Sequence, residues 1–232
     1  MKNIVIAGGS GKLGEYLIKN LKQKNEVISL SRSISKNTKN NYLCNFLNEK
    51  KLSKQLKDIK FKFKKLDCII FTIGNSNKNS YQKDDFFNKM NDNFISFKNL
   101  LDLYCKIFKF HKIKIIVISS IVTEKILLDA PIEYSVSKSA LRQFALIKAK
   151  DLASKNININ IISPGNILLE GNNWSKRLKI NKELTIKYIK QNVPIKKFID
   201  AKMILETCEL IMNDNNNFYT GNNFILDGGQ SL

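Results

Sequence analysis

The chain alternates short apolar runs, rich in isoleucine and valine, with longer segments in which apolar residues recur every three or four positions. The runs are typical of β-strands and the longer segments of amphipathic helices. Strands are predicted over 3–7, 26–30, 42–46, 66–73, 114–119, 157–162 and 223–226. Helices are predicted over 12–24, 48–58, 84–110, 133–154 and 200–213. Strands that alternate with helices in this way predict an α/β fold built on a parallel sheet.

The length and composition are those expected of one soluble domain. The chain is 43% hydrophobic, which suffices for the core of a single α/β domain over residues 1–232. No segment approaches the roughly 18 consecutive apolar residues of a membrane span, and the first residues, MKNIVIAGG, run into a glycine turn. We therefore expect a cytoplasmic protein with no membrane partner. Four widely spaced cysteines and a single histidine predict neither a disulfide framework nor a metal site.

The formal net charge of +19 raises the question of a nucleic-acid partner. Almost all of the excess is lysine, which is spread through every segment beside abundant asparagine and isoleucine. A nucleic-acid-binding face is expected to gather arginine and lysine with exposed aromatic residues. We therefore predict no nucleic-acid partner. A positive field still favours the capture of acidic substrates.

The segment IVIAGGSGKLGEYLIKNL, residues 4–21, reads as a strand, a glycine-rich turn and an amphipathic helix. In such a turn Gly8 permits the tight bend, Gly11 lets the backbone approach a pyrophosphate, and Gly14 lets the helix pack close to the strand. The helix N-terminus offers amide groups and a positive dipole end to the phosphates. The segment therefore predicts a dinucleotide site. Its expected contacts are Gly8, Ser10, Gly11, Lys12, Leu13 and Gly14.

The end of the second predicted strand indicates which dinucleotide is bound. NAD-selective sites place an acidic residue about 20 residues after the glycine turn, where it accepts hydrogen bonds from the ribose 2′-hydroxyl. Here the stretch VISLSRS offers Ser31 and Arg32 instead. Arg32 is suited to pair with a 2′-phosphate, and Lys12 is expected to approach the same charge. We predict NADP(H) as the cofactor; the alternative is that Arg32 is a solvated residue at a strand end.

A tyrosine and a lysine stand four residues apart in EYSVSKSAL, residues 133–141, and so lie on one face of the predicted helix. A phenol with an ordinary pKa near 10 is a poor acid–base group at neutral pH, and a neighbouring ammonium lowers that pKa toward the working range. Tyr134 and Lys138 are therefore candidates for an acid–base pair. The alternative is the exposed surface of a helix.

Seven landmarks in order resemble the short-chain dehydrogenases/reductases over nearly the whole chain. They are the glycine turn, Gly74 in FTIG, Asn93, ISS at 118–120, YSVSK at 134–138, Pro164-Gly165, and YTGNNFILDGG near the C-terminus. The resemblance implies a doubly wound sheet of strand order 3-2-1-4-5-6-7 and NAD(P)-dependent oxidation or reduction of an alcohol–carbonyl pair. It also implies a catalytic tetrad, which falls on Asn93, Ser120, Tyr134 and Lys138.

In the mechanism that this resemblance implies, Tyr134 donates a proton to the carbonyl oxygen and Ser120 hydrogen-bonds the same oxygen. Lys138 tunes the phenol, and Asn93 helps to order a water relay to that lysine. Ser119 competes for the serine role, but the small apolar pair that follows Ser120 favours Ser120. The remaining cofactor contacts are expected from Asn45, Phe46, Gly74, Tyr134, Lys138, Pro164, Gly165 and Ile167.

Several positions depart from the family's common pattern. Lys12 stands where a glycine is usual, and the three-residue glycine spacing matches the extended branch, which includes nucleotide-sugar epimerases. The chain is expected to end before the longer substrate domain of that branch. The aspartate usual near the adenine is Asn45, and the threonine usual after Pro-Gly is absent from PGNILLEGNNW. We interpret the chain as a small reductase with a variant turn, and an epimerase-like enzyme is an alternative.

In this family the segment after Pro-Gly forms a lid over the substrate, here over about 167–193. It is rich in lysine and asparagine and contains Trp174, Arg177, Leu178 and Tyr188. We expect a polar or anionic carbonyl substrate, either a 3-oxoacyl group on an acidic carrier or coenzyme A, or a keto-sugar precursor. The resemblance also implies a dimer or tetramer formed through the two long helices. A dinucleotide-binding regulator or scaffold without turnover is the alternative from another functional class.

Overall fold

The protein is described by a computed structural model that covers residues 1–74, 85–109 and 111–232. Its seven-stranded parallel sheet has the order β3-β2-β1-β4-β5-β6-β9, which confirms the predicted doubly wound order. The strands are β1 (Asn3–Ala7), β2 (Glu26–Ser31), β3 (Asn40–Leu43), β4 (Cys68–Phe71), β5 (Ile113–Ile118), β6 (Ile157–Pro164) and β9 (Asn223–Leu226). Because the chain crosses from β3 back to the other side of β1, a crevice forms at the carboxyl ends of β1 and β4.

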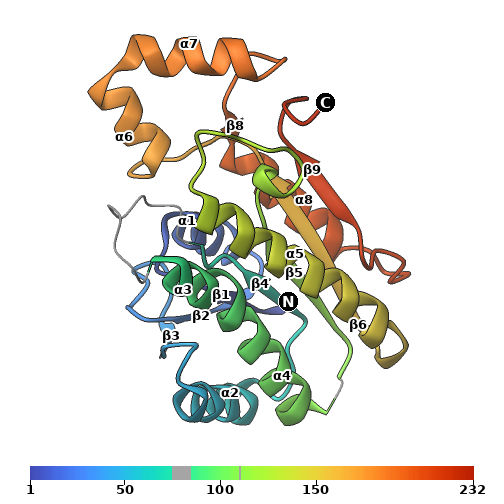
Figure 1. Ribbon diagram of the computed structural model, residues 1–232. Coiled ribbons are helices and arrows are strands. Elements are labelled where there is room, and N and C mark those ends of the chain that lie inside the picture. Colours follow the sequence, from blue (N-terminus) through green and yellow to red (C-terminus); the bar gives the residue numbers. More distant parts are fainter. Residues whose placement is uncertain (75–84, 110) are drawn as a thin grey trace.

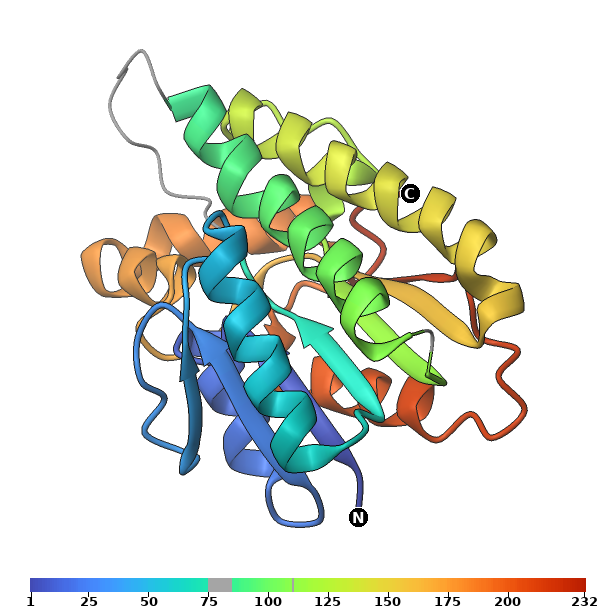
Figure 2. The same cartoon turned by 90° about the horizontal axis from the view of Figure 1, so that it is seen from below.

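Helices cover both faces of the sheet (Figures 1 and 2). One face carries α2 (Glu49–Phe63), α4 (Ser96–Phe108) and α5 (Ile132–Leu152), and the other carries α1 (Lys12–Leu21) and α8 (Ala201–Met212). Each face has its own hydrophobic core, and two cysteines belong to each: Cys44 and Cys105 on the α4 face, Cys68 and Cys208 on the α8 face. Within the described residues, no helix has the length and apolar character that crossing a membrane requires.

The predicted strand over 42–46 was placed too late in the chain. The observed strand β3 ends at Leu43, which pairs with Ser31 at the end of β2. The apolar residues Cys44 and Phe46 are buried beyond the strand, and Phe46 packs edge-to-face on Phe71 with 6.5 Å between the ring centroids. The sequence pattern was therefore misleading here, because apolar residues that are buried in a loop look like those of a strand.

The helix predicted over 84–110 is interrupted. Residues 84 and 110 lie outside the described part of the chain, and between them α3 (Asp85–Met90) leads into a π-helical segment, η1 (Asn91–Ile95), and then into α4. Such π segments insert a residue into an α-helix and occur often at functional sites. Here η1 carries Asn93, which is fully buried.

The segment after β6 projects from the carboxyl edge of the sheet (Figure 1). Two short strands, β7 (Ile167–Leu168) and β8 (Ile199–Asp200), pair in parallel at its base. Between them lie two helices that the hydrophobic pattern did not predict, α6 (Asn173–Ile180) and α7 (Lys182–Asn192). Both begin at asparagine caps: Asn172 accepts a hydrogen bond from the Ser175 N–H (2.9 Å), and Asn181 accepts one from the Leu184 N–H (3.0 Å). The capping asparagines were the sequence signal for these helices.

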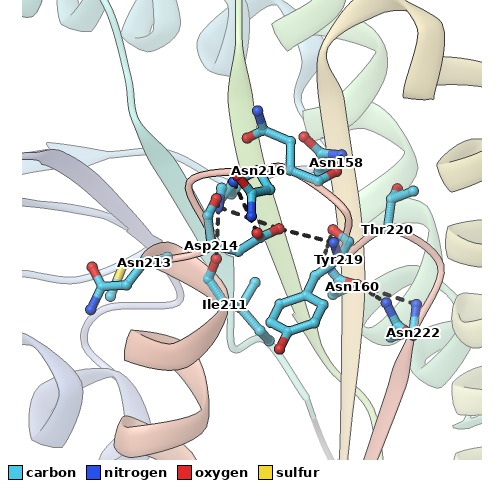
Figure 3. Close-up of polar contacts among 12 residues, drawn as sticks. Asn158, Asn160, Ile211, Asn213, Asp214, Asn216, Tyr219, Thr220 and Asn222 are labelled. Carbon is cyan, nitrogen blue, oxygen red and sulfur yellow. Dashed lines mark hydrogen bonds and ion pairs between the residues drawn. The ribbon is translucent and has the colours of Figure 1, made fainter.

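A polar loop over residues 213–222 joins α8 to β9 and lies beside the first residues of β6 (Figure 3). The Asp214 carboxylate accepts hydrogen bonds from the N–H groups of Tyr219 (2.9 Å) and Asn216 (3.2 Å). On β6, the Asn160 side chain donates to the Tyr219 carbonyl (2.7 Å) and accepts from the Asn222 N–H (3.2 Å). These bonds pair several of the polar groups that the loop buries, although the buried Asn217 Oδ1 has no hydrogen-bond partner among the described residues. They lead the chain into β9 beside β6.

Candidate active site

The predicted acid–base pair lies at the start of α5, where that helix meets the carboxyl edge of the sheet. Tyr134 and Lys138 stand one helical turn apart, and the Lys138 side chain is only 2% exposed. Its Nζ donates hydrogen bonds to the carbonyl oxygens of Ile118 (2.9 Å) and Ile73 (3.3 Å), at the ends of β5 and β4. Burial lowers the pKa of Lys138 to about 7. The ammonium is thus fixed by backbone carbonyls in a place where its charge is costly.

The phenol of Tyr134 hydrogen-bonds the side chain of Ser120, which follows β5. Burial raises the pKa of Tyr134, and the bond to Ser120 acts in the opposite direction without overcoming it. This direction is opposite to the lowering predicted from the Tyr–Lys spacing. Desolvation of the phenolate is the larger effect, and the Lys138 ammonium is directed to two carbonyl oxygens.

The two candidate serines differ in their contacts. Ser120 Oγ meets the Tyr134 phenol and also accepts a hydrogen bond from the Val122 N–H (3.4 Å). Ser119 Oγ is buried and makes no hydrogen bond with any residue that the structure describes. Both residues line the same cavity. The contact with Tyr134 favours Ser120 for the predicted role.

Asn93 reaches the pair through a residue that the sequence analysis missed. Its Nδ2 donates to Ser137 Oγ (2.8 Å), and Ser137 Oγ donates to the carbonyl oxygen of Tyr134 (2.9 Å). Gly74 lies beside the same group: a Cβ there would stand 3.1 Å from Lys138 Nζ and 3.7 Å from Asn93 Oδ1. Ser137, three residues after Tyr134 on the helix, was the available sequence signal.

A small cavity of about 160 Å³ opens beside these groups. It unites the ends of β4, β5 and β6 with the start of α5. Its lining comprises Thr72, Gly74, Ile118, Ser119, Ser120, Tyr134, Lys138, Pro164, Gly165 and Ile167. The structure therefore brings together Ser120, Tyr134 and Lys138 with the predicted cofactor contacts that follow β4 and β6.

The glycine turn lies at the crevice between β1 and β4, and two of its glycines stand where a side chain would be strained or would collide. Gly8 has φ +91°, and a Cβ there would stand 2.8 Å from Thr72 Oγ1. A Cβ at Gly14 would collide with the Gly8 carbonyl oxygen, so only glycine lets α1 begin this close to β1. Gly11 is exposed, and its one close neighbour would be that same oxygen, at 3.2 Å. Its outer side is open to a pyrophosphate.

Arg32 and Lys12, which are predicted to bind the 2′-phosphate, make contacts with other residues in this structure. Arg32 is 69% exposed and forms an ion pair with Asp92 at 3.7 Å. The exposed side chain of Lys12 lies against Gly171 in the segment between β7 and β8, within 3 Å of the position of a Cβ on that glycine. Ser31 is buried, and its Oγ donates to the Ser33 carbonyl (2.7 Å). Ser10 Oγ accepts a hydrogen bond from Ser33 Oγ (2.9 Å).

Three other residues that are predicted to contact the cofactor use their side chains for contacts within the protein. Leu13 packs against the core on the α8 face, and Phe46 belongs to the core on the α4 face. Asn45 is exposed, and its Oδ1 accepts a hydrogen bond from the Leu47 N–H (3.0 Å). Contacts from Leu13 and Phe46 to a cofactor would therefore come from their backbones.

Comparison with known proteins defines the class. A family model described as enoyl-(acyl carrier protein) reductase matches residues 16–231. With its doubly wound sheet, glycine turn and Ser–Tyr–Lys cluster, the chain belongs to the short-chain dehydrogenase/reductase family of oxidoreductases.

The individual relatives are distant. A 3-oxoacyl-[acyl-carrier-protein] reductase of Bos taurus is 29% identical over 99 residues, 43% of this chain and 37% of the relative. An L-xylulose reductase of Caenorhabditis elegans is 30% identical over 106 residues, 45% of this chain and 40% of that protein. The matches thus span about two-fifths of the relatives' length.

Solved structures match over nearly the whole chain. ElxO with NADP bound has a TM-score of 0.87 and 24% identity over 99% of both chains. The ligand-free aldohexose dehydrogenase of Thermoplasma acidophilum has a TM-score of 0.86 and 17% identity, over 99% of this chain and 94% of the other. At these identities the likeness establishes the fold.

Proposed function

We propose that the protein is an NADPH-dependent reductase that converts a carbonyl group to an alcohol. The observation that carries the proposal is the convergence of Ser120, Tyr134 and Lys138 on one cavity beside the glycine turn. When bound, the cofactor supplies a hydride to the carbonyl carbon. Gly8, Gly11 and Gly14 would hold its pyrophosphate, and Lys138 would contact its nicotinamide ribose.

The protonation of the site suits reduction. Burial raises the pKa of Tyr134, so the phenol carries its proton at neutral pH and donates it to the carbonyl oxygen. Ser120, already bonded to that phenol, donates a hydrogen bond to the same oxygen as negative charge develops. The bonds from Asn93 to Ser137 and from Ser137 to the Tyr134 carbonyl fix the turn of helix that carries the phenol.

The cofactor preference rests on what the end of β2 offers. No acidic side chain follows that strand, and Arg32 is largely exposed beside the crevice. An exposed guanidinium with a long 3.7 Å ion pair to Asp92 can turn to a 2′-phosphate. An NADP-bound neighbour of the same fold agrees with this choice.

The substrate we propose is a 3-oxoacyl thioester on an acidic carrier. The segment between β7 and β8, residues 169–198, includes most of the predicted lid and holds eight cationic side chains and two acidic ones, Glu170 and Glu183. The cationic residues are Lys176, Arg177, Lys179, Lys182, Lys187, Lys190, Lys196 and Lys197. Exposed apolar side chains also stand on the 124–131 loop, with Ile126 87% and Leu128 96% exposed. This loop meets α7, where Asp129 hydrogen-bonds Tyr188. Positive charge beside apolar surface suits an acyl chain on an anionic carrier.

Oxidation of NADPH in the presence of an acetoacetyl thioester tests the proposal, with a keto-sugar as the competing substrate. We expect turnover with the thioester and a loss of about 100- to 10,000-fold in Tyr134→Phe, which retains the fold but has no proton to donate. Turnover confined to the keto-sugar would reassign the substrate. Tight NADPH binding without turnover on either compound would favour a regulator, and a Tyr134→Phe protein as active as the parent would refute the proton-donor role.

A further inference from the structure

The loop between β2 and β3 is tied to the first turn of α1 by one carboxylate. Glu15, the residue after Gly14, accepts hydrogen bonds from Ser35 Oγ (2.9 Å), the Lys36 N–H (3.1 Å) and Asn37 Nδ2 (2.6 Å). Three successive residues of a surface loop thus donate to a single side chain. A carboxylate has about four acceptor positions, so Glu15 uses most of its capacity on this loop.

The same loop is held at two further points. Ser33 Oγ donates to Ser10 Oγ in the glycine turn (2.9 Å). From the side of β3, Asn41 Oδ1 accepts from the Ser35 N–H (2.8 Å), and Asn41 Nδ2 donates to the Ser35 carbonyl (3.1 Å). Ser35 is 1% exposed at the centre of these bonds. The conformation of the loop is therefore set jointly by α1, the glycine turn and β3.

The loop starts where the 2′-phosphate of NADPH is expected to bind. It begins with Arg32 at the end of β2, and the exposed side chain of Lys36 follows within it. A free carboxylate at this place would repel a phosphate or accept hydrogen bonds from the ribose hydroxyls of NADH. Glu15 directs its oxygens to the loop donors instead, and those donors offset its charge.

We propose that Glu15 is a positioning residue for cofactor choice: it fixes loop 32–38 in the conformation that receives the 2′-phosphate of NADPH. The inference rests on the proposed NADPH dependence. It implies that an acidic residue supports the binding of a more negatively charged cofactor, because its contribution is the geometry of the loop and not its own field.

The experiment titrates NADPH and NADH, by the fluorescence of the reduced nicotinamide, into the parent protein and two variants. Glu15→Gln places an amide donor against the loop donors, and Ser35→Ala removes one donor without changing the charge. We expect both variants to bind NADPH more weakly, Glu15→Gln by about tenfold, with NADH affinity changed by no more than about twofold. The matched control is Glu26→Gln. Glu26 lies at the start of β2 and accepts a hydrogen bond from Asn40, so this change removes the same charge without touching the donors of residues 35–37.

The outcomes separate this inference from the proposed function. Tighter NADPH binding in Glu15→Gln would show simple repulsion, and selective loss of NADH would make Glu15 a ribose ligand. Either result overturns the inference, as do an unchanged preference or an equal loss of both cofactors. A parent protein that binds both cofactors equally would contradict the proposed NADPH dependence itself. A parent that prefers NADPH, with variants that keep that preference, contradicts only the role of Glu15.

Discussion

At the residue scale, the most unusual group is Lys138. Burial lowers its pKa to about 7, against an ordinary 10.5, so the folded protein releases this proton well before the unfolded chain does. Below pH 7 both forms hold the proton, and the folded form bears the full cost of the buried charge. Between 7 and 10.5 the unfolded chain binds more protons, so the free energy of unfolding rises with pH through this window.

Lys138→Met is therefore expected to separate stability from activity. It removes the buried charge but leaves the Ile118 and Ile73 carbonyls without this donor, so the net gain in unfolding free energy below pH 7 should be about 1–3 kcal/mol. The variant should also lose the rise in stability between 7 and 10.5, and it should lose turnover and cofactor affinity. Urea unfolding at about pH 6 and about pH 9 measures the first two effects.

The control for this change is Lys148→Met, farther along α5. Lys148 forms an ion pair with Asp151 at 3.1 Å, and its side chain is 30% exposed. Its replacement should leave both the pH dependence and the turnover nearly unchanged. A Lys138→Met protein that keeps the parent's rise in stability would show that another group titrates in this window.

The two adjacent serines give a second prediction. Only Ser120 bonds the Tyr134 phenol, so Ser120→Ala should lower kcat by about 100- to 1,000-fold, as the loss of one hydrogen-bond donor to a developing oxyanion does. Ser119→Ala removes a hydroxyl that has no partner among the described residues, and its kcat should stay within a few-fold of the parent. Steady-state kinetics with saturating NADPH compares them. The reverse ranking would transfer the role to Ser119.

The sequence predicted the charged and glycine positions of the site better than the residues that support them. The spacing of Tyr134 and Lys138 follows from helical periodicity alone, and Gly8 and Gly14 follow from the strand–turn–helix context. Ser137 and Glu15 act through partners distant in the sequence, Asn93 and the 35–37 loop. No local pattern specifies such partners, because the tertiary fold brings them together.

At the element scale, the π segment η1 places Asn93 against α5. Ser137→Ala removes the acceptor of the Asn93 side chain in a buried setting and should lower the free energy of unfolding by about 1–3 kcal/mol. Ser139→Ala, two residues away and exposed, matches the gain in helix propensity without touching η1. Thermal unfolding of the pair isolates the contact. Equal melting temperatures for the two variants would mean that the Asn93–Ser137 bond adds no stability.

The elements themselves were predictable to differing degrees. Strands that are buried on both faces have continuous apolar runs, and six of the seven predicted strands form close to their predicted bounds. The exception is β3, which is only partly buried and was predicted too late in the chain. Helix α6 buries none of its residues and α7 buries only Thr185 and Ile189, so neither has the apolar stripe on which periodicity depends. The π segment has no periodic signature, because its sequence still reads as a continuous helix.

At the scale of the whole molecule, α5 has apolar side chains that the described residues leave exposed. Val136 is 42% exposed and Ile147 57% exposed, on a helix whose opposite side packs on the sheet. We expect this helix to meet the same helix of a second copy in a dimer or tetramer. Light scattering at micromolar concentration measures the assembly. A stable monomer would contradict the prediction, and Ile147→Lys should weaken a dimer that does form.

The protein has four cysteines, two on each face of the sheet. The rates at which their thiols react therefore measure how each face of the protein opens. Burial raises the pKa of Cys44 and Cys68 to about 12 and raises those of Cys105 and Cys208 as well, so the reactive thiolate is scarce in the folded state. Partly buried Cys105 should react first. Alkylation of the buried thiols, Cys44 on the α4 face and Cys68 and Cys208 on the α8 face, has to wait until a layer separates from the sheet. Mass spectrometry of timed samples would then show which side of the sheet loosens before the other.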